Sequence, residues 1–353
     1  MTLYGSVDLH SNNNYAMISD GEDRVIHKEK LANDLEKVDA FFSLYKSQLS
    51  AIVVESTYNG YWLVDGLQEL GYAVKLANPS AMQPYRGLKY SNDETDALWL
   101  NRMNRLGVLP EGYIYPKPQR GLRDLLRRRM FLVHTRTSLV NSLKHQYQSW
   151  KGLEMSRSRF ERLEAEEIRE VFKDGYLQQA ALSFSESIQS LSRYIDQIED
   201  SVFKALKEDE QVRRLVVLPG IGKILGWMIR LEIGERDRFK GVENYLSYCG
   251  LVESRRMSNE KLKGRGNAKN RNKYLRWAYG EAAIAALRNS RIRKYHDRLA
   301  RKKGPIKAKA IVASKLARIS FMLMKDSTLV YDENKLFFSS GQPAGDVSEK
   351  TIA

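Results

Sequence analysis

Four apolar residues in a row, Ala51–Val54, limit the fold of this chain more than any other feature of the sequence. Three of the four are β-branched, and such a run directly before an acid, Glu55, is typical of a parallel strand that is buried on both faces. A helix-period stretch at 61–72 and a strand-like run at 73–78, stopped by Pro79, follow it. A buried strand, a helix and a second strand in this order predict an α/β domain.

Shorter strand-like runs precede this part of the chain, at 3–9, 14–19 and 24–27. An Asp-Gly-Glu-Asp turn separates the last two, so the three runs predict a β-meander. Together with the later alternation of helix and strand, the meander predicts a mixed sheet with helices on its faces.

Helical periodicity replaces the strand pattern from about residue 120. Residues 120–148 carry an apolar stripe with a basic opposite face, on which we expect nucleic-acid contacts from Arg123, Arg127 and Arg128. A heptad ladder follows, formed by Phe184, Ile188, Leu191, Ile195, Ile198 and Val202. Its spacing predicts a narrow seam that packs against a partner helix, either in an intramolecular helical hairpin or in a dimerising coiled coil.

The charge of the chain indicates its class of partner. A net charge of +15 and a pI near 9.6 in a folded chain favour a polyanion, and nucleic acid is the commonest one. We expect no membrane span, because no apolar run approaches the ~18–20 residues that a bilayer requires. The N-terminus lacks a signal-peptide pattern, and the single cysteine, Cys249, excludes an internal disulfide framework. The five histidines show no ligand spacing, and we expect a cytoplasmic protein.

Four acids are candidates for a metal site. Asp8 and Glu55 lie where strands end, and in open α/β sheets the carboxyl ends of the strands face a common crevice. Asp93 and Asp96 are three residues apart at a helix start, which places both on one helix face. Converging carboxylates of this kind can bind Mg²⁺, with Mn²⁺ as a substitute, and activate a phosphodiester. Alternatively, the acids are ordinary turn and helix-start residues.

A glycine-rich turn lies farther along the chain, in the segment LPGIGKILG at 218–226. It resembles the turn of a helix-hairpin-helix module, in which Gly220 and Gly222 would permit a tight turn and a close approach of backbone N–H groups to phosphate. Lys223 would add positive charge at the start of the next helix. Such a hairpin contacts the backbone of a nucleic acid without reading its sequence, whereas the simpler alternative is a plain turn between two core helices.

A dense basic segment follows the hairpin. Between Arg255 and Arg276 there is one acid, Glu260, and nine basic residues: Arg255, Arg256, Lys261, Lys263, Arg265, Lys269, Arg271, Lys273 and Arg276. The glycines and asparagines among them predict a flexible loop that runs into a helix near Tyr274, and we expect it to contact phosphates. A further basic run at 288–309 and the helix at 120–144 offer two more surfaces for DNA or RNA.

Three short motifs resemble a known family. VDLH at 7–10, VVEST at 53–57 and DETDA at 93–97 look like the acidic motifs of the DEDD transposases of insertion sequences, the family that includes the Piv-type invertases and the bridge-RNA-guided recombinases. PGIG, GLV and NKYLR resemble the C-terminal part of that family. The likeness implies an RNase H-like (RuvC-like) N-terminal domain whose catalytic tetrad falls on Asp8, Glu55, Asp93 and Asp96.

The same resemblance implies a nucleophilic serine in the C-terminal part. Alignment on GLV and NKYLR places it on Ser258, with Ser254 as a rival, and Glu253 stands where many members have proline. The serine would attack DNA and form a 5′-phosphoserine in a composite site with the acids, across the protomers of a homodimer or homotetramer. The implied partners are donor and target double-stranded DNA and a structured bridge RNA, in the nucleoid of a bacterium.

The interpretation therefore has four parts: an acidic RuvC-like domain at 1–118, a basic helix and coiled coil or helical hairpin at 119–208, a mostly α serine domain with the helix-hairpin-helix at 209–325, and a loose tail at 326–353. It predicts a DNA recombinase or transposase. The alternatives are a metal-only nuclease of the Holliday-junction-resolvase kind, which would use water as its nucleophile, and a nucleic-acid-binding protein without catalysis.

Overall fold

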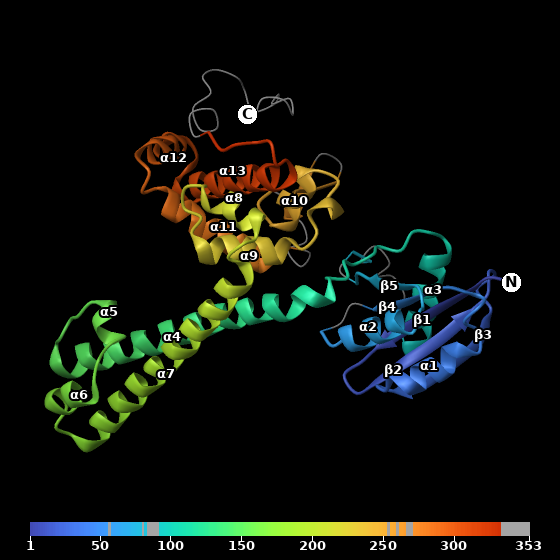
Figure 1. The fold of residues 1–353 in the computed structure, drawn as a ribbon, viewed down its shortest axis with the longest axis horizontal. Helices are drawn as coiled ribbons and strands as arrows, with labels where there is room; N and C mark the ends of the chain where they lie inside the picture. The colour runs from blue at the N-terminus through green and yellow to red at the C-terminus, as the bar shows by residue number, and fades with distance from the viewer. Residues whose placement is uncertain are drawn as a thin grey trace. The chain divides into compact units, whose positions relative to one another are not determined.

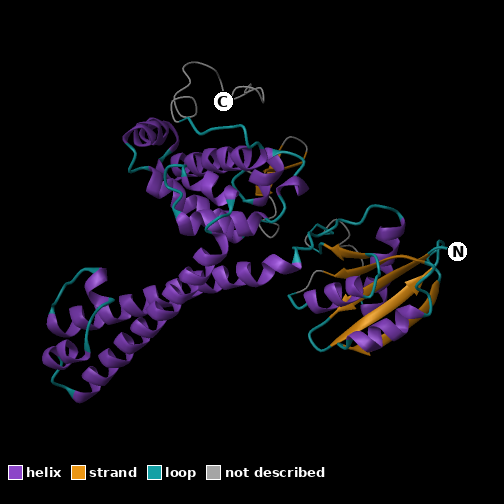
Figure 2. Ribbon diagram, in the orientation of Figure 1, coloured by secondary structure: helices purple, strands orange, loops and turns teal. Residues whose placement is uncertain are grey.

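The computed structural model describes residues 1–55, 58–79, 81–82, 92–252, 255–258, 261–265 and 271–332; for 255–258 and 261–265 it describes the backbone alone. The chain divides into two compact units, Met1–Lys117 and Pro118–Ala353. The first contains a mixed sheet and the second is mostly helical (Figures 1 and 2). Of the loose tail predicted at 326–353, residues 326–332 are described, and Arg214 donates hydrogen bonds to the carbonyls of Asp326, Ser327 and Leu329. The rest of the tail lies outside the described residues.

The first unit is built on a five-stranded sheet with the order β3-β2-β1-β4-β5. Its strands β1 to β3 form an antiparallel meander, and β4 and β5 continue the sheet parallel to β1. The predicted mixed sheet is thereby confirmed. The strand bounds are β1 Leu3–Leu9, β2 Asn13–Ser19, β3 Val25–Ala32, β4 Leu49–Glu55 and β5 Val74–Ala77.

Helices cover both faces of this sheet: α1 Leu35–Ser43, α2 Tyr61–Glu69 and α3 Asp93–Arg105. Because side chains alternate along a strand, Val7 and Val54 lie on one face, where they share a core with Phe42 of α1 and Leu63 of α2. The opposite face carries α3, since Val53 packs with Leu100 of that helix. The residues that alternate with the main core, Asp8 among them, therefore face α3.

Two long helices open the second unit, α4 Lys117–Lys151 and α7 Gly175–Leu206 (Figure 1). They run antiparallel, because Gln146 bonds to Leu177 near one end and Arg129 pairs with Glu199 toward the other. The short helices α5 Arg157–Phe160 and α6 Ala165–Val171 lie between them in the chain. The heptad face of α7 thus packs at least partly against α4 of the same chain. The dimerising coiled coil stays a prediction.

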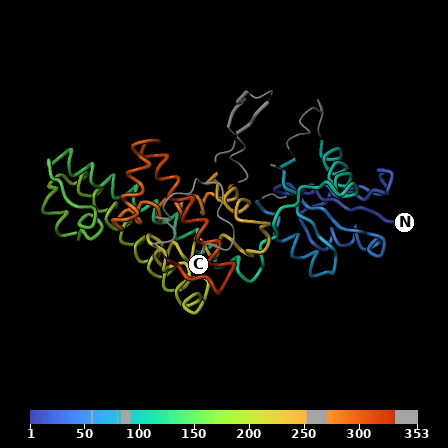
Figure 3. The backbone as a smooth tube through the Cα atoms, turned by 90° about the horizontal axis from the view of Figure 1, so that it is seen from above, coloured from blue at the N-terminus to red at the C-terminus, as the bar shows by residue number. Residues whose placement is uncertain are grey.

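The remaining helices pack around a second large core. In chain order they are α8 Glu210–Val216, α9 Lys223–Ile233, the 3₁₀ turn η2 Arg236–Arg238, α10 Val242–Tyr248, α11 Lys273–Ala286, α12 Ser290–Lys303 and α13 Pro305–Lys325. Helices α12 and α13, orange to red in Figure 3, pack against each other.

Three segments differ from the sequence-based expectation. The basic loop contains a two-stranded antiparallel hairpin, β6 Arg255–Ser258 and β7 Lys261–Arg265, whose register pairs Met257 with Leu262. Residues 151–175, whose mixed charges predict no clear core, bury Phe160 and Phe172 edge-on against Tyr147 of α4. Helix α1 was not predicted, although its buried residues Val38, Phe41 and Phe42 have helical spacing.

Candidate functional site

Asp8 and Glu55 lie side by side on the α3 face of the sheet. Strands β1 and β4 are parallel neighbours, and Val7 pairs with Val54, so the two acids that follow come next to each other. Asp8 is 3% exposed and Glu55 is half-buried at the strand end. Their positions follow from the strand pattern that the sequence predicted.

Helix α3 brings the other two acids to the same face. Asn92 caps the helix: its side chain accepts a hydrogen bond from the Thr95 N–H, and Thr95 reciprocates, so the helix begins at Asp93. The Ser6 hydroxyl of β1 donates to the Ala97 carbonyl at 2.7 Å, which docks the first turn of α3 over β1. Asp93 and Asp96 are therefore held above the strand that carries Asp8.

The electrostatics of Glu55 show how close the carboxylates lie. Burial raises the pKa of Glu55, a hydrogen bond with Asp8 and the negative charges of Asp8 and Asp96 raise it further, and the value reaches about 7. His10 opposes the shift. Like charges that share a buried site cannot all ionise without a compensating cation. The arrangement of these acids is therefore suited to a cation, whereas their role as metal ligands stays a prediction.

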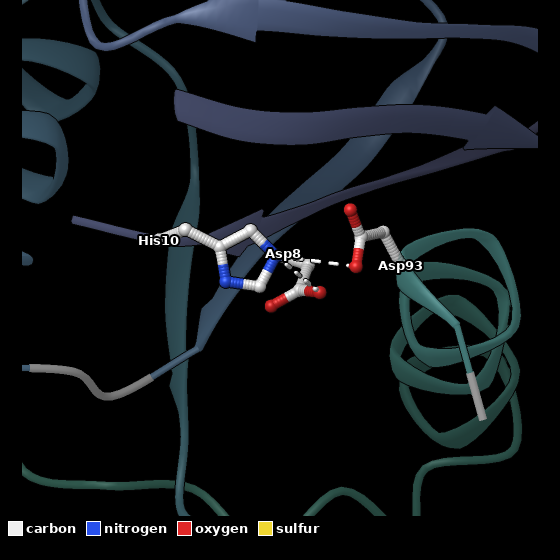
Figure 4. A group of neighbouring side chains, drawn as sticks. All are labelled: Asp8, His10 and Asp93. Carbon is white, nitrogen blue, oxygen red and sulfur yellow. Dashed lines mark ion pairs between the residues drawn. The ribbon is translucent and has the colours of Figure 1, made fainter. Parts of the chain in front are cut away.

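His10 is the residue of this site that sequence reasoning missed. Its Nε2 lies 3.5 Å from Asp8 Oδ2 and 3.3 Å from Asp93 Oδ1 (Figure 4). The search for histidine pairs at ligand spacing could not find it, because its partners come from β1 and from a helix that begins 83 positions later in the chain. A signal was present, since His10 stands two residues after Asp8 at the end of the same strand.

The described residues contain one group of three or more His, Cys, Asp or Glu side chains with the spacing of metal ligands, namely Asp8, His10 and Asp93. Their candidate ligand atoms all lie within 4.8 Å of one another. Carboxylate oxygens with a neutral imidazole nitrogen are a donor set that divalent ions accept. The residues present thus fit a divalent cation, and Glu55 and Asp96 adjoin the group.

In the second unit, the two glycines of the PGIG turn have different surroundings. Gly220 has a φ of +85°, and a Cβ there would lie 2.1 Å from the Ala282 carbonyl oxygen of α11. This glycine is therefore needed for the turn and for close packing against α11. At Gly222, which is exposed at the start of α9, a Cβ would meet no atom within 4 Å. Gly222 and the neighbouring exposed Lys223 remain the candidates for phosphate contact.

The three arginines predicted on α4 also differ. Arg123 is 7% exposed, and Arg127 makes a two-pronged ion pair with the buried Glu232, with N–O distances of 2.5 and 2.8 Å. Arg128 is exposed, with its guanidinium over the Phe131 ring. Arg128 is therefore the member of this set with a surface suited to nucleic acid, whereas Arg127 already serves a buried acid.

The basic segment is described only in part. Arg255, Arg256, Lys261, Lys263 and Arg265 lie on the β6–β7 hairpin, and Ser258 is the last residue of β6. Their side chains lie outside the description, as do all atoms of Ser254 and Lys269.

Beyond this hairpin, Arg271, Lys273 and Arg276 are exposed at and near the start of α11, and Arg276 bonds to the Gly250 carbonyl. The basic run at 288–309 forms α12 and its flanks. On α12 the side chains of Arg291, Lys294, Arg298 and Arg301 are exposed at a spacing of three or four residues, so they share one face. This surface joins the candidates for nucleic-acid contact.

Among the helices of the described residues, none combines the length and the apolar character needed to cross a bilayer.

Comparisons with known proteins point to one family. A model of DEDD-type IS110 transposases matches residues 6–149, and a model described as the transposase IS116/IS110/IS902 family matches residues 212–297. The chain is 24% identical over 297 residues to the transposase for insertion sequence element IS1328 of Yersinia enterocolitica, over 79% of this chain and 84% of that one. A protein of Pseudomonas aeruginosa named as a probable family 20 transposase is 22% identical over 290 residues, 78% of this chain and 84% of its own length.

Proposed function

Since this chain carries the two domains of insertion-sequence transposases of the IS110 family, we propose that it cuts and rejoins DNA with a metal-assisted carboxylate site in its first unit and a serine nucleophile in its second. The observation that carries the proposal is the convergence of Asp8, Glu55, Asp93 and Asp96 on one face of the sheet. A protein that only binds DNA would not require negative charges placed so closely that they raise the pKa of Glu55.

The proposed fold of the first unit is RNase H-like. An antiparallel meander of three strands, continued by two strands parallel to the first, is the arrangement expected of that fold, and the order β3-β2-β1-β4-β5 fits it. The acids lie on the central strand, on its parallel neighbour and on the helix that covers them. A divalent ion, Mg²⁺ or Mn²⁺ in the proposal, would stabilise negative charge on the attacking and leaving oxygens of a phosphodiester exchange.

In the proposed reaction, the acids bind the cation and the serine is the nucleophile. Asp8, Glu55, Asp93 and Asp96 hold the cation, and the burial of Asp8 restricts its carboxylate to one direction. The Ser258 hydroxyl attacks phosphorus, its proton passes to a base, and the 3′ oxygen of the broken strand leaves. A 5′-phosphoserine and a free 3′-OH result, so the phosphoester bond is kept for rejoining. Ser254 is the alternative nucleophile.

The basic surfaces would hold the nucleic acids. Arg128, Lys223 and α12 offer exposed charge in the second unit, and the sequence of the β6–β7 hairpin adds five basic residues. Each phosphate that a cation neutralises steepens the salt dependence of binding by about one unit. We further propose that a bridge RNA shares these surfaces with donor and target DNA, and that the protein acts as a homodimer or homotetramer in the bacterial cytoplasm.

Trapping of a covalent adduct tests the proposal. The full-length protein is incubated with Mg²⁺ and DNA that carries the ends of its element, and protein-linked 5′ ends are detected on denaturing gels. We expect adduct from the unmodified protein and from Ser254→Ala, and none from Ser258→Ala or Asp8→Asn. Adduct from Ser258→Ala but not from Ser254→Ala would move the nucleophile to Ser254. Cleavage without any adduct would instead show a metal-only nuclease.

The hairpin can be tested with its own pair of glycines. Gly222→Ala should leave the unfolding temperature unchanged and weaken DNA binding, because its added methyl meets open space where a phosphate would approach. Gly220→Ala should lower the unfolding temperature, because its methyl meets the backbone of α11 and its φ is positive. Unchanged DNA affinity in Gly222→Ala, measured by fluorescence anisotropy, would make the hairpin a plain structural turn.

A further inference from the structure

We propose that His10 is a nitrogen ligand of the divalent ion, bound through Nε2 together with Asp8 and Asp93. The inference rests on the metal site of the proposed function and adds a residue that lies outside the four acids. It also predicts which metals the site prefers.

The distances in this group are close to those of a coordination sphere. Ligand atoms on adjacent positions of an octahedral ion with bonds of about 2.0–2.1 Å are separated by roughly 3 Å. His10 Nε2 lies 3.3 Å from Asp93 Oδ1 and 3.5 Å from Asp8 Oδ2. Both distances exceed that separation by a few tenths of an ångström, and the candidate ligand atoms of all three residues lie within 4.8 Å of one another. All three side chains point toward the same place in Figure 4.

The backbone of His10 is fixed from several directions. Its N–H donates to the Asn13 carbonyl at 2.9 Å, which closes the turn between β1 and β2. Its carbonyl accepts from the side-chain amides of Asn33 and Asn59, each at 3.0 Å. These two asparagines come from different loops, so the position of His10 is set by the surrounding structure and not by its own strand alone. A ligand needs such support to keep its geometry.

The exposure of His10 also suits a ligand. Its side chain is 42% exposed, as is that of Asp93, whereas Asp8 is 5% exposed. The buried carboxylate closes one side of the group, and the open side leaves room for water and a DNA phosphate on the ion. Glu55 shares a hydrogen bond with Asp8, and Asp96 is close enough to Glu55 to raise its pKa, so both acids can supply further oxygen ligands.

A simpler role for His10 is an ion pair with Asp8 and Asp93 in the metal-free protein. The two roles differ in what happens when metal is added. In the ion pair, the metal would displace a charged imidazolium. In the ligand role, the neutral ring donates its nitrogen to the ion. An imidazole ligand raises the affinity for Mn²⁺ and Co²⁺ more than that for Mg²⁺, which prefers hard oxygen ligands.

Electron spin echo spectroscopy of Mn²⁺ bound to the full-length, untagged protein tests the role directly. We expect a ¹⁴N modulation from a coordinated imidazole in the unmodified protein, without any substitution that could disturb folding. The modulation should disappear in His10→Ala and persist in His145→Ala, which removes an exposed histidine from α4 in the other unit.

Calorimetric titration with each metal supplies the second readout. His10→Ala should weaken Mn²⁺ binding on the order of tenfold and Mg²⁺ binding by less, because the lost ligand is a nitrogen. Mn²⁺ binding without ¹⁴N modulation, with equal losses for both metals, would overturn the role of His10 and leave the carboxylate site intact. Failure of the unmodified protein to bind either metal would overturn the metal site of the proposed function itself.

Discussion

Each unit of the molecule buries carboxylates, and the two units neutralise them in opposite ways. Glu232 of the second unit, 2% exposed, accepts two hydrogen bonds from Arg127 and a third, at 2.7 Å, from Asn272. In the first unit, Asp8 is about as deeply buried, but it shares a hydrogen bond with another acid, Glu55. Burial and the nearby Asp8 raise the pKa of Glu55 to about 7.

The difference separates a structural acid from a candidate functional one. Glu232 is neutralised by groups of the chain itself, and through Asn272, which caps α11, it fixes the start of that helix. Among the described residues, His10 contacts Asp8 and opposes the raised pKa of Glu55, and a proton or an added cation can complete the balance of charge. The stability of the second unit therefore depends on Arg127, whereas that of the first depends on the pH and on the cations in solution.

The largest expected effect follows from removing Arg127. Arg127→Ala leaves Glu232 buried without its ionic partner, and loss of one partner of a buried pair costs about 3–5 kcal/mol. Urea unfolding of the full-length protein, followed by a probe in the second unit, should show a loss of this size in the free energy of unfolding.

Arg128→Ala is the matched control on the same helix. Arg128 is exposed, so its loss should change stability by less than about 0.5 kcal/mol while weakening DNA binding. An Arg127→Ala protein as stable as the unmodified one, with a loss in DNA binding alone, would contradict the structural role of Arg127. Arg127 would then belong to the nucleic-acid surface that the sequence predicted.

A smaller effect, of opposite sign, is expected when Glu55 is replaced: above neutral pH the protein should gain stability. Its pKa in the folded protein, about 7, lies above its ordinary value of 4.5, so the folded state holds a proton that the unfolded state releases. Without metal, this contribution to stability is fully present below about pH 4.5 and is lost as the pH rises through 7. One pKa unit corresponds to about 1.4 kcal/mol, and partial exposure reduces the total to about 1–2 kcal/mol.

The measurement is the free energy of unfolding from pH 5 to 8.5 in EDTA, for the unmodified protein and for Glu55→Gln. The glutamine cannot ionise, so the difference between the two proteins should grow in favour of Glu55→Gln toward high pH. Mg²⁺ at 100 times its dissociation constant should stabilise the unmodified protein by about 2.7 kcal/mol and the variant by less. Curves that stay parallel over the whole range would show that the acids of the first unit do not repel one another.

The sequence predicted the sheet and the positions of its acids better than it predicted which charged residues form structural ion pairs. The local apolar pattern predicted β1 at 3–9 with its bounds, and it predicted β4 at 51–55, two residues short of its start at Leu49. The positions of Asp8 and Glu55 at or near the ends of these strands follow from strand geometry. Asp93 and Asp96 were placed correctly relative to each other by helix spacing. Their approach to Asp8 depends on the packing of α3 over β1, for which the motif resemblance supplied the evidence and the local pattern did not.

What the sequence could not predict depends on contacts between distant segments. Arg127 and Glu232 are 105 residues apart, and nothing in the basic face of α4 marks Arg127 as the partner of a buried acid and Arg128 as exposed. Gly220 shows the same limit, because its need for glycine comes from the backbone of α11 and not from the turn alone. His10 was missed since its partners converge only in three dimensions.

Asp23 provides an intermediate case, and the smallest predicted effect. It lies in the turn between β2 and β3, and its carboxylate accepts hydrogen bonds from Arg105 and Arg102 near the end of α3. The hydrogen bond from Arg105 lowers the pKa of Asp23, that from Arg102 adds to the effect, and burial opposes it. Like Glu232 it has arginine partners, but its side chain is 13% exposed where that of Glu232 is 1% exposed, so solvent weakens the interaction.

Asp23→Asn isolates the charge, because asparagine also tolerates the positive φ of +64° at this position. We expect a loss of about 1 kcal/mol in the free energy of unfolding at pH 7. Since the folded pKa is lowered, the contribution is present above the ordinary pKa of an aspartate and disappears as the pH falls through the folded value. The stabilities of the two proteins should therefore approach each other as the pH falls below the ordinary aspartate value of 3.8. A loss at pH 7 as large as that of Arg127→Ala would show that the exposure of a carboxylate does not set how much its arginine partners contribute to stability, and that the contrast between the two units has another cause.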